Sequence, residues 1–126
     1  MSKRKGVNAE RELFHMFWQN GWACSRIAGS GSNQYPSPDL LAGNGGRLLA
    51  IECKFTKNNR VYLPIKRAKA LADYSRKIGA ECWLAVRFSE WYFFSLEDLN
   101  LTKKSLVINR DVLRNKGIFF EDLIKR

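Results

Sequence analysis

The hydrophobic positions near the N-terminus recur every three to four residues, which is the spacing of one face of an α-helix. They are Ala9, Leu13, Met16 and Phe17. Asn8 can cap the start of this helix, and Gly21 follows Asn20 as a stop signal. The pattern therefore predicts an amphipathic helix over residues 8–20.

The polar and apolar pattern then changes to that of β-structure. Residues 22–27 are typical of a strand, and two further β-rich runs, 39–42 and 47–55, flank Asn44-Gly45-Gly46. Such a turn between two apolar runs predicts a hairpin. The segment 28–38 is rich in Gly, Ser and Pro, so we expect a loop that is too short to separate two domains.

A second amphipathic helix is predicted between Pro64, a favoured first-turn residue, and Gly79. Its inward residues are expected to be Ile65, Ala68, Leu71, Ala72 and Ile78, and its outward residues Lys66, Arg67, Lys69, Arg76 and Lys77. Strands are expected at 81–88 and 91–95, an edge strand at 106–108 and a short helix at 119–125. This order predicts one α/β domain over residues 1–126, with a central mixed sheet of about five strands flanked by helices.

The net charge of the chain indicates which class of molecule it binds. The 126 residues include 22 Lys and Arg against 12 Asp and Glu, a formal net charge of +10. Such a balance favours a polyanion, and nucleic acid ahead of a membrane surface or a merely solvated face. The scattered Cys24, Cys53 and Cys82 argue against a disulfide framework or a structural zinc site, and no apolar stretch approaches the roughly 18 residues of a membrane span. We expect a cytoplasmic protein without a membrane partner.

Several enzyme classes are excluded by missing motifs. The sequence has no GxSxG, GxxxxGK or GxGxxG, so nothing indicates a small-molecule cofactor. Its single histidine, His15, falls in the first predicted helix beside aromatic residues, where a packing role is more common than a catalytic one.

The candidate catalytic residues lie on the predicted hairpin. Glu52 and Lys54 are two residues apart and project from the same face of a strand. A turn centred on Gly45-Gly46 puts Asp39 directly opposite Glu52, and one centred a residue earlier makes the two carboxylates diagonal neighbours. A three-residue loop would instead turn Asp39 to the other face.

Two converging carboxylates repel each other unless a hard cation lies between them, and Mg²⁺ prefers such oxygen ligands. The carbonyl of Cys53 offers another oxygen, and a lysine beside a phosphodiester can orient or deprotonate water. The set indicates a metal-dependent nuclease. A Glu-x-Lys triplet also arises by composition on solvated strand edges, but here it follows the apolar residues 48–51.

Three charged residues outside the hairpin have two interpretations each. Glu10 shares helical spacing with Leu13 and can point inward, or it can simply favour the helix dipole. Arg11 and Arg26 can bind phosphate, or they can form ordinary surface ion pairs.

These residues occur in a familiar arrangement. RKG at 4–6, AERELF at 9–14, a strand ending in Arg26, AGSGS at 28–32, PDLLAGNG at 38–45 and AIECK at 50–54 make the chain similar, to about residue 95, to the archaeal Holliday-junction resolvases of the Hjc type. These belong to the PD-(D/E)xK nuclease superfamily. The resemblance implies a restriction-endonuclease-like nuclease fold.

The resemblance also implies residue roles. Asp39 and Glu52 would be metal ligands, Lys54 the catalytic lysine and Glu10 the essential helix glutamate at the metal site, while Ser30 matches a serine that some members need for cleavage, in a mobile loop over 28–38. We expect DNA contacts from the basic N-terminal segment 1–6, the basic second helix and two family arginines: Lys3, Arg4, Lys5, Arg11, Arg26, Lys66, Arg67 and Lys69.

The implied activity is resolution of four-way DNA junctions in recombination and repair, by paired nicks made with Mg²⁺ or Mn²⁺. A two-fold substrate suits a symmetric homodimer with two sites, and the aromatic strands 83–88 and 91–94 are either its interface or ordinary core. Alternatives are a restriction- or repair-type endonuclease of the same fold and a catalytically silent DNA-binding module. An RNA-splicing endonuclease relative would need a His-centred site.

Overall fold

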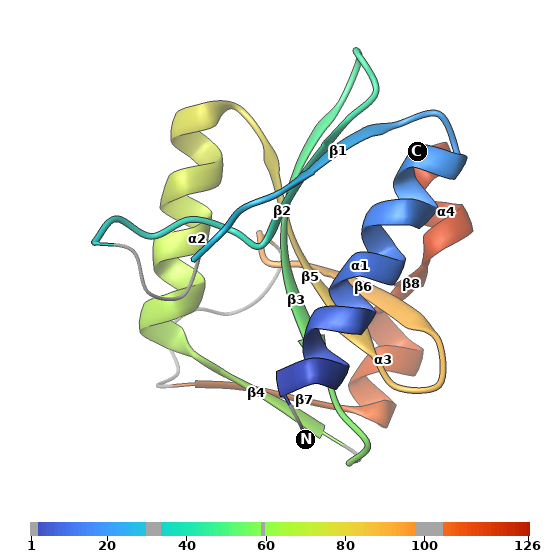
Figure 1. Cartoon of the computed structure of the whole chain (residues 1–126). Helices are drawn as coiled ribbons and strands as arrows, with labels where there is room; N and C mark the ends of the chain where they lie inside the picture. Colours follow the sequence, from blue (N-terminus) through green and yellow to red (C-terminus); the bar gives the residue numbers. More distant parts are fainter. Residues whose placement is uncertain (1–2, 30–33, 59, 98–104) are drawn as a thin grey trace.

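The computed structural model describes residues 3–29, 34–58, 60–97 and 105–126 (Figure 1). Its elements, in chain order, are α1 (Lys3–Gln19), β1 (Ala23–Arg26), β2 (Leu40–Gly43), β3 (Leu48–Phe55), β4 (Arg60–Pro64), α2 (Ile65–Ile78), β5 (Glu81–Arg87), β6 (Trp91–Ser95), β7 (Ser105–Asn109), α3 (Arg110–Lys116), β8 (Ile118–Phe119) and α4 (Phe120–Lys125). Within these residues, no helix combines the length and apolar character needed to cross a membrane.

The main sheet has six strands in the order β1-β2-β3-β5-β6-β8. The β3–β5 pair is parallel because β4 and α2 carry the chain back across the sheet, and the other pairs are antiparallel. The predicted α/β domain with a mixed sheet is confirmed. A separate two-stranded ladder joins β4 to β7.

The sheet separates two hydrophobic cores. One lies under α1 and α4, and the other under α2, α3 and the β4–β7 ladder (Figure 1). Side chains alternate along β3, so Leu49 and Ile51 enter the first core. Glu52 and Lys54 consequently face the side of the sheet that α2 covers.

Several local predictions differ from the structure, either in the bounds of an element or because an element was not predicted. The first helix begins at Lys3 and includes Asn8 in its interior, because an exposed Asn costs a helix only a few tenths of a kcal/mol. Neither β4 nor α3 was predicted. The first turn of α3 is capped by Asn109, whose Oδ1 accepts a hydrogen bond from Val112 N at 2.9 Å.

The aromatic strands belong to the core of the single chain. Trp83, Trp91, Phe93 and Phe94 are each at most 5% exposed. Of the two interpretations of the aromatic strands, ordinary core holds for these four side chains, because α1 and α4 cover one side of their strands and the β4–β7 ladder covers the other. Ile78, predicted to point inward, is instead exposed at the end of α2.

Arg47 connects the end of the hairpin to the centre of the sheet and to the C-terminus. Its guanidinium donates two hydrogen bonds of 2.8 Å to the Glu81 carboxylate and one of 2.6 Å to the Leu123 carbonyl, and it lies over the Trp22 ring. The Arg47 guanidinium thereby lowers the pKa of the Glu81 carboxyl.

This ion pair predicts a pH-dependent contribution to stability. Because the pKa of Glu81 is lower in the folded state than its ordinary 4.5, the contribution is present above that value and is lost as the pH falls through the folded-state pKa. Both side chains are partly solvated, so we expect Glu81→Gln to cost about 1 kcal/mol at neutral pH. Urea denaturation from about pH 6 to about pH 3 measures this. A difference between parent and variant that does not shrink in acid, or an equal effect of the exposed-site control Glu90→Gln, contradicts the assignment.

Candidate active site

The register of the hairpin is set at its turn. Asn44 Oδ1 accepts hydrogen bonds from Gly46 N at 2.9 Å and Arg47 N at 2.7 Å, while Gly45 takes a positive φ of 94° that suits glycine. Leu40 consequently pairs with Ile51. Gly43 pairs with Leu48, so the turn is centred on Gly45-Gly46. Asp39 precedes the first paired residue of β2, and its carboxylate lies close enough to Glu52 for its charge to raise the pKa of that group.

The side chain of Asp39 forms a hydrogen bond with the backbone of the neighbouring strand, β3. Its Oδ2 accepts a hydrogen bond of 2.8 Å from Cys53 N, and its own amide donates to Ile51 O at 3.0 Å. Burial raises the pKa of the Cys53 thiol well above its ordinary value, with the nearby carboxylates adding to the effect. Cys53 therefore keeps a neutral side chain and offers its backbone to the site.

Glu52 is only 6% exposed and is held by an arginine of α2. Arg67 Nε lies 3.0 Å from Oε2 and Arg67 Nη2 lies 2.9 Å from Oε1. The same Nη2 donates to the carbonyl of Ser37, two residues before Asp39, at 2.8 Å. Burial raises the pKa of Glu52, Arg67 opposes that shift, the charge of Asp39 adds to it and the charge of Lys54 opposes it.

Glu10 approaches the same site from α1. Its Oε1 accepts a hydrogen bond of 3.1 Å from Arg26 Nε at the end of β1. Burial raises the pKa of Glu10, the hydrogen bond from Arg26 opposes the shift, and the negative charge of Asp39 raises it further. The inward orientation is thus the correct one of the two interpretations of Glu10.

The donor chemistry of the site fits a hard divalent cation. The charge of Asp39 raises the pKa of Glu52, and a cation between the two carboxylates would remove that repulsion. The buried Oγ of Ser37 makes no hydrogen bond within the described residues. In that same part of the chain, no three His, Cys, Asp or Glu side chains are grouped as metal ligands, so Glu10 as a further ligand stays a prediction.

The other predicted residues are spread more widely. Ser30 lies outside the described residues, as do the side chains of Lys3 and Arg4, although both residues belong to α1. Lys5, Arg11, Lys66 and Lys69 are exposed on α1 and α2. Their contacts with DNA stay predictions.

Arg67 belongs to the candidate site, although the sequence pattern did not place it there. It was assigned to the outer basic face of its helix on account of its charge, and the structure turns it toward Glu52. The signal was its spacing, because Arg67 precedes the buried Leu71 by four residues and the buried Ser75 by eight. Those intervals put all three on one row of the helix.

A six-stranded mixed sheet that brings the carboxylates of Asp39 and Glu52 close to Lys54 defines a nuclease-like α/β protein. The model of the archaeal Holliday junction resolvase family, Hjc, matches residues 1–126. The chain belongs to this family.

Individual relatives agree with this assignment. A crossover junction endodeoxyribonuclease Hjc of Archaeoglobus fulgidus is 38% identical over 112 residues, which cover 87% of this chain and 82% of the relative. The Methanocaldococcus jannaschii Hjc is 32% identical over 119 residues, 94% of this chain and 86% of that one. The solved structure of Archaeoglobus fulgidus Hjc, a Holliday junction resolvase, superposes with a TM-score of 0.86 at 34% identity and covers 94% of this chain and 97% of its own.

The buried Glu52–Arg67 pair generates a prediction. Arg67→Ala would leave the Glu52 carboxylate buried without its main counterion, so we expect a loss of about 2 kcal/mol of unfolding free energy. Adding Glu52→Gln to Arg67→Ala should recover about 1 kcal/mol, because it removes the uncompensated charge. Urea denaturation of both single variants and the double variant measures the coupling. The exposed Lys69→Ala on the same helix is the control, with an expected change within about 0.5 kcal/mol. Strictly additive effects would contradict the pairing.

Proposed function

We propose that this chain is a structure-selective endodeoxyribonuclease that hydrolyses phosphodiesters at four-way DNA junctions, in recombination and repair. The observation that carries the proposal is the proximity of the Asp39 and Glu52 carboxylates to each other and to Lys54, in a chain of the resolvase family. The formal charge of +10 supports a phosphate-rich substrate.

Each residue of the candidate site has its own proposed role. Asp39 and Glu52, with the Cys53 carbonyl and Glu10, would hold Mg²⁺, which Mn²⁺ can replace. When bound, the metal would act as a Lewis acid toward the phosphodiester. Lys54, on the same face as Glu52, would orient the attacking water and balance negative charge in the transition state. Arg67 acts through Glu52 as a positioning residue, because it touches that carboxylate.

Binding of the whole junction would rest on phosphates and branched shape rather than on base reading. The proposed phosphate contacts are Lys3, Arg4, Lys5 and Arg11 near the N-terminus and Lys66 and Lys69 on α2. Arg26 and Arg67 already neutralise Glu10 and Glu52, so their first role would be inside the site. A symmetric homodimer would supply two sites for two opposing strands.

The test compares a labelled synthetic four-way junction with a linear duplex of the same sequence, with Mg²⁺ and with chelator. We expect paired symmetric nicks in the junction alone and only with metal. Glu52→Gln should lower the rate by at least about a hundredfold, because it removes a charged oxygen ligand. The matched control Glu90→Gln, at an exposed position, should cut as the parent does.

The other outcomes separate the alternatives. Equal cutting of both DNAs would keep the nuclease and reject the junction selectivity. A junction that is bound and left whole in Mg²⁺ and in Mn²⁺ would overturn the catalytic proposal.

A further inference from the structure

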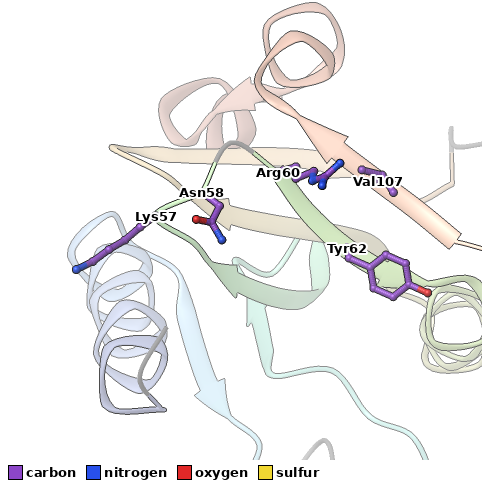
Figure 2. A pocket seen from close by; sticks show the side chains of 5 residues that line it. All are labelled: Lys57, Asn58, Arg60, Tyr62 and Val107. Atoms are coloured by element: carbon purple, nitrogen blue, oxygen red, sulfur yellow. The ribbon is translucent and has the colours of Figure 1, made fainter.

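A shallow groove runs along the β4–β7 ladder, and neither Asp39 nor Glu52 is among the residues that line it. It has a volume of about 1010 Å³ and is lined by Lys57, Asn58, Arg60, Tyr62 and Val107 (Figure 2). The lining follows from strand alternation: Val61 and Leu63 are buried, so Arg60 and Tyr62 point out. Tyr62 pairs across the ladder with Val107. The groove is therefore fixed by paired backbone along most of its length.

The groove is strongly cationic. None of the lining side chains that the structure describes is acidic, and the ion pairs of the described residues include neither Lys57 nor Arg60. Lys57 points toward α1 (Figure 2), where it meets Lys5, and this contact between two ammonium groups lowers the pKa of Lys5. Two cations held together favour an anion that neutralises both.

The groove also combines these cations with exposed apolar surface. Tyr62 is 59% exposed and Val107 is 48% exposed. A tyrosine between basic residues suits a nucleic-acid strand, since its hydroxyl can donate to a phosphate and its ring can pack on a sugar or a base. A small anion would need only the positive charges of Lys57 and Arg60, and not the exposed tyrosine ring.

The position of the groove connects it with the candidate active site. Lys57 follows Lys54 by three residues where the chain leaves β3. At about 3.3 Å per residue of fully extended chain, the two backbone positions are at most roughly 10 Å apart. This is about three times the 3.4 Å rise between nucleotides of one DNA strand. A strand held at the site would reach the groove within a few nucleotides.

We infer that the groove of Lys57, Asn58, Arg60, Tyr62 and Val107 binds the sugar–phosphate backbone of the DNA strand that continues beyond the cleaved phosphate. This inference rests on the proposed function. Lys57 and Arg60 bind successive phosphates, and Tyr62 packs against the strand between them. The groove thereby directs one arm of the substrate away from the carboxylates.

The experiment measures junction binding by fluorescence anisotropy in chelator over a series of salt concentrations, so that no cleavage occurs. Lys57→Ala/Arg60→Ala removes two phosphate contacts. We expect affinity to fall about tenfold or more near physiological salt, and the slope of log K against log salt to decrease by about two. Tyr62→Ala should weaken binding with an unchanged slope.

The matched control is Arg76→Ala/Lys77→Ala, which also removes two positive charges. Both residues pair with Asp73 at the far end of α2 from β4 (Figure 1). The control should keep the parent's salt slope. Thermal unfolding reports whether each variant is folded, and the single variant Lys57→Gln, in an exposed turn, repeats the test with the least change to the ladder.

Unchanged affinity and slope in a folded Lys57→Ala/Arg60→Ala variant would overturn the inference. So would a Tyr62→Ala variant that loses self-association in sedimentation while binding DNA as before, since the face would then join two copies of the chain. Failure of the proposed function is distinguishable, because it would appear in the parent as absent junction cleavage with Mg²⁺.

Discussion

A carboxylate in the interior of a sheet needs a counterion, and this requirement organises the candidate site. Glu52 lies on β3 between β2 and β5 and is almost completely buried, so its charge would be very costly if it were unpaired. Arg67 meets both of its oxygens and also binds the carbonyl of Ser37. One guanidinium therefore fixes α2, β3 and the segment that leads into Asp39.

The second requirement is the register of the hairpin. Strand side chains alternate, so a slip of one residue at the turn would move Asp39 to the opposite face of the sheet from Glu52. The hydrogen bonds of the Asn44 side chain and the positive φ of Gly45 exclude that slip. The turn is thus about as important for the chemistry as the carboxylates that it aligns.

The parts of this structure that depend on residues near in the sequence could be predicted. The parts that depend on residues far away in the sequence could not. The hairpin, α2 and the shared face of Glu52 and Lys54 follow from local periodicity. The strand β4 was missed because it is stabilised by β7, whose Asn109 pairs with Arg60 across a long stretch of sequence. Arg67 was misassigned because charge alone does not tell a solvated arginine from one that neutralises a buried carboxylate.

The central proposal is that Asp39 and Glu52 together hold a divalent cation. Anomalous X-ray scattering from crystals soaked in Mn²⁺ tests it most directly, with Glu52→Gln crystals as the comparison. The account predicts a strong manganese peak within ligand distance of both carboxylates in the parent, and a weakened or absent peak in the variant. Manganese bound elsewhere in the parent, with no peak between Asp39 and Glu52, would contradict it.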